Sequence, residues 1–95
     1  MKNPQIKFHK DGSKVWTLNG DYHREDGPAI VSVYGIREWF IKGQRHREDG
    51  PAIEIDGKPS RWFLNGKEVS WQEVYNQAKT PEIRKRILAA VPVDF

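Results

Sequence analysis

Short runs in which hydrophobic and polar residues alternate fill the first two thirds of the chain. Alternation of this kind predicts half-buried β-strands. Between the runs lie the turn residues Asp11-Gly12, Gly35 and Asp56-Gly57, which favour tight hairpins. Neighbouring strands joined by short connections pair antiparallel. We therefore predict a mainly β fold, a six-stranded antiparallel meander with strands near residues 5–9, 14–19, 28–34, 37–42, 51–56 and 60–65.

The chain also repeats itself with a period of 23 residues. The octapeptide His-Arg-Glu-Asp-Gly-Pro-Ala-Ile occurs at residues 23–30 and again, unchanged, at residues 46–53. The same period relates three tryptophans and three glycines, which are Trp16, Trp39 and Trp62, and Gly20, Gly43 and Gly66. A fixed period of this length is typical of repeat proteins, whose units pack against their neighbours. Residues 1–69 then divide into a half unit (5–12), two full units (13–35 and 36–58) and a partial unit (59–69).

The equivalent strands place their tryptophans on one face of the sheet. Residues two apart in a strand share a face. Leu18, Ile41 and Leu64 lie on that face too, and Val15, Phe40 and Phe63 lie on the other. The equal spacing predicts a ladder of tryptophans along the sheet, stabilised by cross-strand aromatic contacts and part of the core. The alternative is a surface on which a ligand stacks.

Residues 70–95 predict two helices that cap the sheet within the same domain. Ser70 followed by Glu73 forms a capping box, and Thr80 before Pro81 marks a second helix start. Apolar residues then recur at helical spacing: Trp71, Val74, Tyr75 and Ala78 in the first helix, and Ile83, Ile87, Leu88 and Val91 in the second. Such a cap covers a sheet face or the open edge after the last strand. The alternative is a helix face that docks a partner.

Composition limits the class of protein. The chain has 95 residues, enough for one domain, and no cysteine, which excludes disulfides and thiolate metal sites and favours a reducing compartment. The N-terminal residues lack the apolar stretch of a signal peptide, and no apolar run approaches a membrane span. We therefore expect a cytoplasmic protein without membrane contact. The 16 basic residues are interspersed with 13 acidic ones, so the net charge of +3 is not concentrated as in dedicated nucleic-acid binders.

The units resemble MORN repeats, in which an aromatic strand is followed by an Asn-Gly turn, a histidine and a second strand. Residues 16–23, with Asn19-Gly20 as the turn, and residues 39–46 follow this order, and residues 62–68 follow its first half. The family's Gly-x-Gly after the histidine is replaced by Arg-Glu-Asp-Gly-Pro-Ala, a form similar to repeats in small proteins of phages and large viruses. The resemblance covers residues 13–68 and implies a sheet meander. Its viral form implies an accessory protein that inhibits a host defence complex in the host cytoplasm.

Identical charged residues in both octapeptides need an explanation, because surface positions normally drift between repeats. One interpretation is architectural. Residues 26–28 and 49–51, both Asp-Gly-Pro, form turns in which the Asp accepts backbone N–H groups and the Pro begins the next strand. Arg24 and Arg47 would then pair with Glu or Asp of the neighbouring copy and hold the two loops in register.

The other interpretation makes the loops a contact surface, since both leave the same end of the sheet one repeat apart. The candidate partner-binding residues are His23, Arg24, Glu25, Asp26, Arg45, His46, Arg47, Glu48 and Asp49. A protein that forms salt bridges with them is the favoured partner. Nucleic-acid or nucleotide binding through Arg24, Arg45, Arg47 and Lys67 is the alternative, which the adjoining carboxylates oppose by cancelling the positive field.

Metal and catalytic chemistry find little support in the sequence. A metal site would require His23, His46 and a carboxylate to converge, and catalysis would use a Glu–His acid–base pair. No nucleophile elbow, P-loop or zinc-protease helix is present, and a thin meander offers no deep cleft. His9 has no counterpart in the repeats and is expected to be a solvated edge residue. We therefore predict a non-enzymatic protein-binding module with no catalytic residue, metal or cofactor.

Overall fold

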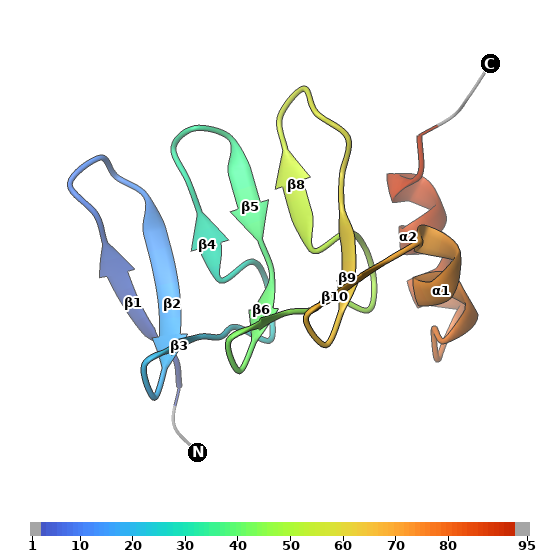
Figure 1. Ribbon diagram of the computed structural model, residues 1–95, viewed down its shortest axis with the longest axis horizontal. Helices are drawn as coiled ribbons and strands as arrows, with labels where there is room; N and C mark the ends of the chain where they lie inside the picture. Colours follow the sequence, from blue (N-terminus) through green and yellow to red (C-terminus); the bar gives the residue numbers. More distant parts are fainter. Residues whose placement is uncertain (1–2, 93–95) are drawn as a thin grey trace.

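A computed structural model describes residues 3–92, so residues 1–2 of the predicted repeat region and residues 93–95 of the predicted cap lie outside the described residues. The strands are β1 (Gln5–Phe8), β2 (Lys14–Leu18), β3 (Asp21–Tyr22), β4 (Ile30–Val31), β5 (Ile36–Glu38), β6 (Phe40–Ile41), β7 (Gln44–Arg45), β8 (Ile53–Ile55), β9 (Trp62–Leu64) and β10 (Lys67–Val69). The helices are α1 (Trp71–Asn76) and α2 (Pro81–Ala90). Figure 1 shows successive hairpins side by side, with both helices beyond the last hairpin.

The strands pair antiparallel throughout residues 3–92. The main sheet has the order β1-β2-β4-β5-β8, and β3 pairs with β2 as its sixth strand. Two small sheets, β6–β7 and β9–β10, complete the β structure. The predicted fold class, an antiparallel meander followed by two C-terminal helices, is confirmed. Neither helix in this part of the chain is long and apolar enough to cross a membrane.

The sequence period is also the period of the main hairpins. The hairpins β1–β2, β4–β5 and β8–β9 are equivalent, with the central pairs Lys7–Val15, Ile30–Glu38 and Ile53–Arg61. Each hairpin joins the next through the same edges, β2 to β4 and β5 to β8. The structure is therefore a row of similar units in which each contacts its neighbours.

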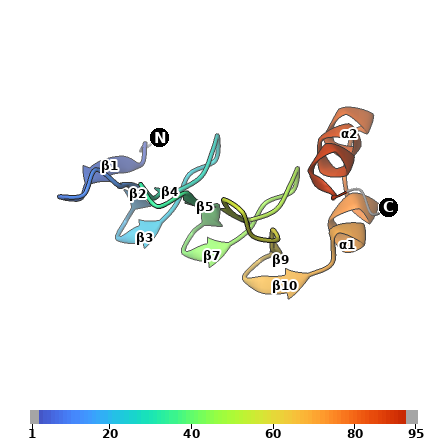
Figure 2. The same ribbon diagram turned by 90° about the horizontal axis from the view of Figure 1, so that it is seen from above.

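A second, shorter hairpin follows the tryptophan of each unit, and the sequence did not predict its returning strands β3, β7 and β10. Figure 2 shows these strands along one side of the row. The turns are residues 19–20, 42–43 and 65–66, and Asn19, Lys42 and Asn65 have φ of 53°, 51° and 52° before a glycine of positive φ. Two successive residues with positive φ form the type I′ turn that matches the twist of a hairpin. The chain therefore reverses at the turn that the resemblance implied, and the short strand after each turn is the part that was not predicted.

Several predicted strands are shorter in the structure. Trp39 divides the predicted strand 37–42, because its N–H donates to the Ala52 carbonyl at 2.8 Å and its own carbonyl accepts from the His46 N–H at 3.1 Å. The first bond joins Trp39 to the segment before β8 of the main sheet, and the second joins it to the segment after β7 of a small sheet, so the chain bends at the tryptophan. The strands predicted at 28–34 and 51–56 are reduced to β4 and β8, since their prolines belong to the octapeptide loops.

The predicted ladder of stacked tryptophans is wrong. Within residues 3–92 the aromatic ring pairs are Tyr22–Phe40, with centroids 5.2 Å apart, and one pair inside α1. The aromatic contact between these units is therefore made by Phe40, on the other face. At the next interface Arg45 takes the place of Tyr22, with its guanidinium 5.7 Å from the Phe63 ring. Octapeptide arginines cover Trp16 and Trp39, as described below, and the helices pack on Trp62. Trp39 and Trp62 still pack in the core clusters, as predicted.

Both helices begin where the sequence predicts. The hydroxyl of Ser70 accepts the Glu73 N–H at 3.3 Å, and the hydroxyl of Thr80 accepts the Ile83 N–H at 3.1 Å. Each bond satisfies one of the backbone donors left free at a helix start. Pro81 stands in the first turn of α2, where its missing N–H costs nothing.

The helices close the C-terminal end of the row by packing on its last tryptophan. Trp62, Val74 and Ile87 form one buried cluster, and Val74 and Ile87 are fully buried. Ser70 occupies the repeat position of Arg24 and Arg47, so the helices begin where an arginine would otherwise cover this tryptophan. One stripe residue was predicted wrongly: Leu88 is 49% exposed, because it lies one position beyond the buried face of α2.

Candidate partner-binding groove

Each octapeptide loop is closed by its own arginine. In the second loop, Nε of Arg47 donates to the Asp49 carboxylate at 2.8 Å and Nη1 donates to the Pro51 carbonyl at 3.0 Å. In the first loop, Arg24 repeats these two bonds at 2.8 and 3.1 Å. The prediction that the arginines pair with the neighbouring copy is therefore wrong. Each arginine instead bonds to the Asp two residues further along the chain, because the turn brings that carboxylate onto the guanidinium.

The same guanidinium groups lie over the rings of the tryptophans. Cζ of Arg24 is 4.0 Å from the ring centroid of Trp16, and Cζ of Arg47 is 3.9 Å from that of Trp39. The loop glycine makes room for this arrangement, because a Cβ at Gly50 would lie 2.7 Å from Cζ of Arg47, and the equivalent distance in the first loop is 2.9 Å. A larger residue at this position would push the guanidinium out of this arrangement.

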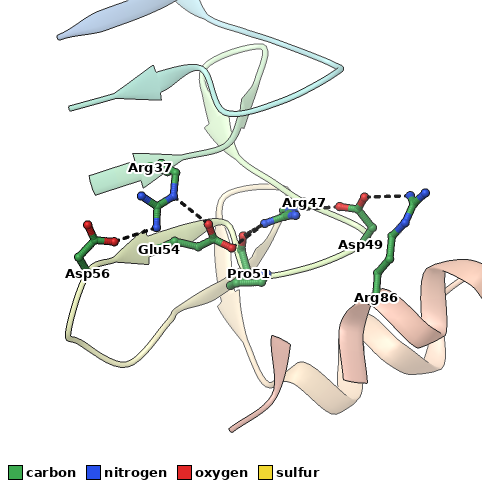
Figure 3. A network of polar contacts seen from close by, with 7 residues as sticks. All are labelled: Arg37, Arg47, Asp49, Pro51, Glu54, Asp56 and Arg86. Atoms are coloured by element: carbon green, nitrogen blue, oxygen red, sulfur yellow. Dashed lines mark hydrogen bonds and ion pairs between the residues drawn. The ribbon is translucent and has the colours of Figure 1, made fainter. Parts of the chain in front are cut away.

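The second loop is also part of a longer network of charges. Arg47 donates to Glu54 at 3.1 Å, Glu54 accepts from Arg37, and Arg86 of α2 lies 3.5 Å from Asp49. Figure 3 shows the alternating series Asp56, Arg37, Glu54, Arg47, Asp49 and Arg86. Valine stands at the position of Glu54 in the first unit, so the first loop lacks this connection.

The octapeptide histidines connect neighbouring units. Nδ1 of His23 accepts the backbone N–H of Lys42, and Nδ1 of His46 accepts that of Asn65, both at 2.9 Å. Both donors are the first positive-φ residue of the next unit's short hairpin. His23 is buried, with 6% of its surface exposed. The identity of the histidine in both copies therefore has a structural cause.

The bonds of His46 also define its tautomer. Nδ1 accepts an N–H and must be unprotonated, so in the neutral ring Nε2 carries the proton. Nε2 lies 2.9 Å from a carboxylate oxygen of Glu48 and donates to it. Both ring nitrogens are used, which leaves neither free to act as a general base.

The two loops and α2 enclose a groove of about 900 Å³. Its apolar surface comes from Trp39, Ile41 and Ile83. Its charged rim consists of three arginines and four acidic residues, which are Arg24, Arg47 and Arg86, and Glu25, Asp26, Glu48 and Asp49. Because the two loop arginines are bonded inside their loops, the carboxylates and Arg86 are the charges most available to a partner, and the side chains of Asp26, Glu48 and Arg86 are 86%, 52% and 68% exposed. Glu25 is exposed and makes no ion pair within residues 3–92.

Most of the predicted partner-binding residues line this groove, and two do not. His23 lines a separate cavity of about 490 Å³ near the N-terminal end of the row. Arg45 donates to Glu38 at 3.0 Å and packs on Phe40 and Phe63, so it belongs to the interface between units. The other seven predicted residues, 24–26 and 46–49, all border the groove.

The sequence missed the contribution of α2. Ile83 was predicted as part of an apolar stripe that covers the sheet, and Arg86 was not singled out. Both line the groove, and Arg86 reaches Asp49. No sequence signal pairs α2 with the second loop, because that contact depends on how the cap packs on Trp62. His9 is exposed, as predicted.

Electrostatics in the first loop favour the charged form of the Asp26 carboxylate. The hydrogen bond from Arg24, together with its positive charge, lowers the pKa of Asp26 from its ordinary value of 3.8. Asp26 is 86% exposed and therefore presents a charged carboxylate on the outside of the first loop.

No group of three or more His, Asp or Glu side chains is arranged to hold a metal ion among residues 3–92. Comparisons with known protein families, curated proteins and solved structures found no match. The resemblance to MORN repeats therefore stays a prediction, and the site has to be interpreted from its own geometry.

Proposed function

We propose that the protein is a non-enzymatic binding module that holds a segment of a protein partner in the groove between the octapeptide loops. The observation that carries this proposal is the separation of roles within each loop. The arginine and Nδ1 of the histidine are bonded inside the fold, whereas the glutamates line the groove. Glu25 makes no ion pair within residues 3–92, and Glu48 bonds to His46 alone and keeps 52% of its side chain exposed. A surface that keeps carboxylates accessible above an apolar floor fits a polypeptide.

The chemistry of the groove indicates the kind of segment. Trp39, Ile41 and Ile83 offer an apolar surface for one side chain of the partner, and the rim carboxylates offer ion pairs to a lysine or arginine beside it. A volume of about 900 Å³ is in the range of sites that hold a few residues or a small ligand. The bonding of both His46 ring nitrogens supports a role in binding without catalysis.

The resemblance to viral repeats extends the proposal to a biological setting. The partner would be a component of a host defence complex, and binding in the host cytoplasm would inhibit it by occupying a surface that the complex needs. This part rests on the resemblance alone, whereas the binding groove rests on the geometry of the loops.

The proposal is tested with Glu25→Gln and Glu48→Gln in one chain. Glutamine keeps an acceptor for the His46 ring, so the loops should stay folded while the rim loses two charges. Tagged wild-type and variant chains are used to isolate partners from host extract, and the affinity of the purified partner is then measured. We expect the affinity to fall by about 2 kcal/mol, the size of an interface hot spot.

Glu82→Gln serves as the matched control, because Glu82 lies on α2 but does not line the groove. It should bind as the wild type does. If the double variant also binds normally, the groove is not the contact surface. Binding of a labelled DNA or RNA that weakens steeply with salt, and is insensitive to the glutamate changes, would favour the nucleic-acid alternative instead.

A further inference from the structure

Strand β1 leaves one end of the main sheet open. All four of its residues, Gln5–Phe8, are exposed, and within residues 3–92 the strand pairs only with β2. Figure 1 shows β1 at the end of the row opposite α1 and α2. An open edge presents unpaired backbone N–H and C=O groups, to which another strand can add.

The backbone groups that face the open side belong to Ile6 and Phe8. The N–H of His9 donates to the Ser13 carbonyl at 2.9 Å, so His9 faces β2. Backbone groups in an antiparallel pair alternate between the two sides, so Lys7 faces β2 as well. Ile6 and Phe8 therefore direct their N–H and C=O groups away from the sheet.

The interior of the row contains the same edge in its filled state. Ala29 and Ala52 occupy the repeat position of Ile6, are fully buried, and accept the N–H of Trp16 at 2.7 Å and of Trp39 at 2.8 Å. At the open end the small residue is replaced by isoleucine, which is 50% exposed, and the neighbouring Phe8 is 69% exposed. The N–H groups of Ala29 and Ala52 bond inside their own hairpins, to the carbonyls of Glu38 and Arg61, so it is the carbonyl at this position that accepts a neighbouring strand. The open edge presents the equivalent carbonyl of Ile6 and adds apolar side chains beside it.

The charges around this edge distinguish between possible occupants. Lys7 lies on the strand and Lys10 just beyond it, and Lys14 of β2 places its ammonium 5.8 Å from the Phe8 ring. These three cations outnumber the one nearby carboxylate, Asp11, which accepts the Ser13 N–H at 2.8 Å. A second copy paired through β1 would bring the same lysines together, and like charges on neighbouring strands are unfavourable. A strand with acidic residues would instead be attracted.

We propose that β1 is a docking surface for an extended segment of a partner protein in which apolar and acidic residues alternate. The segment adds to the sheet as a further strand, its backbone bonded to Ile6 and Phe8. Its apolar side chains cover Ile6 and Phe8, and its carboxylates meet Lys7 on the opposite face of the strand. This surface is independent of the groove, since no residue of β1 lines the groove.

The test uses two labelled eight-residue peptides, one of alternating valine and glutamate and one of alternating valine and lysine. Fluorescence anisotropy of the full chain should show affinity for the glutamate peptide at least about ten-fold higher than for the lysine peptide, with the difference reduced by salt. Amide hydrogen exchange should show new protection at Ile6 and Phe8. Equal affinity for both peptides, or no gain in protection at these amides, would overturn the proposal.

Two variants locate the binding. Phe8→Pro removes one outward N–H and the exposed ring and should abolish measurable binding. Lys7→Glu with Lys10→Glu should reverse the peptide preference, and it keeps the test valid if the proline variant fails to fold. The groove variant Glu25→Gln with Glu48→Gln should bind the peptide as the wild type does. A sedimentation mass that doubles with concentration and returns to one chain in Phe8→Pro would show that a second copy occupies the edge, against the proposal.

Discussion

At the scale of single residues, one guanidinium group organises each octapeptide loop. The guanidinium of Arg47 is planar and carries its donors along its edges. Its face can therefore lie on Trp39 while its edges donate to Asp49, the Pro51 carbonyl and Glu54. Lysine has a single charged point and cannot combine a flat contact with bonds in fixed directions. The form that both loops share therefore depends on arginine in particular.

Replacing this side chain should destabilise the fold. We expect Arg47→Ala to lower the free energy of unfolding by about 2–3 kcal/mol, because charge-assisted hydrogen bonds and a cation–π contact are lost together. Arg24→Ala should cost about 1–2 kcal/mol, since the first loop has no equivalent of Glu54. Arg47→Lys should recover little of the loss. Urea unfolding measures all three, and equal stability of Arg47→Lys and wild type would contradict the role of the planar group.

Asp26 should make stability depend on acid pH. The hydrogen bond from Arg24 lowers the pKa of its carboxyl in the folded chain. A group with a lowered folded pKa contributes stability above its unfolded pKa, and this contribution is lost as the pH falls through the folded value. The difference in free energy of unfolding between wild type and Asp26→Asn should therefore be largest near neutral pH and should shrink below about pH 4. A difference that stays constant from pH 7 to 3 would exclude the pairing.

At the scale of elements, the sequence predicts what depends on short-range patterns. Alternation located six strands and the capping residues located both helices, because these signals act within a few residues. It did not separate β5 from β6, since that division depends on where Trp39 finds hydrogen-bond partners in distant residues. The short returning strands also escaped prediction, because a strand of two or three residues has too few positions to show alternation.

Lys42 offers a test of the short hairpins. It has φ of 51°, where asparagine is tolerated better than lysine, and the two equivalent positions carry asparagine. Lys42→Asn should therefore raise the free energy of unfolding by about 1 kcal/mol or less, since a left-handed conformation costs most residues roughly that much. Thermal unfolding would show the gain. Lys67→Asn, in a strand without positive φ, is the control and should not stabilise the chain.

The helical cap should be essential for stability. Ile87 of α2 is fully buried in the cluster with Trp62. Ile87→Ala should therefore lower the free energy of unfolding by about 2–4 kcal/mol through lost contacts and a cavity. Leu88→Ala is a matched control on the next residue, which is 49% exposed, and should cost less than about 1 kcal/mol. Chemical denaturation measures both. Similar losses in the two variants would mean that α2 is not anchored by its buried face.

At the scale of the whole molecule, the period in the sequence is enough to predict a row of units, but not what each repeated side chain does. Identical residues in both octapeptides indicate a shared constraint and do not distinguish an internal bond from a contact with a partner. The structure assigns His46 and Arg47 to internal bonds and leaves Glu25 exposed. That distinction depends on where the loops lie relative to the next hairpin and to α2, which are distant in sequence.

Each octapeptide histidine bonds to the next unit in the same way, so a unit could be removed or added without creating a new kind of contact between units. Deleting residues 24–46 would join His23 to Arg47, restore one intact octapeptide, and place His23 where His46 now meets Asn65. We expect the shortened chain to fold, as circular dichroism and thermal unfolding would show, but to bind no partner in the groove, because a groove needs two loops. An in-frame duplication at the gene level would instead create a third loop and a second groove. Unequal recombination between the repeats would thus change the number of binding grooves by one for each unit lost or gained.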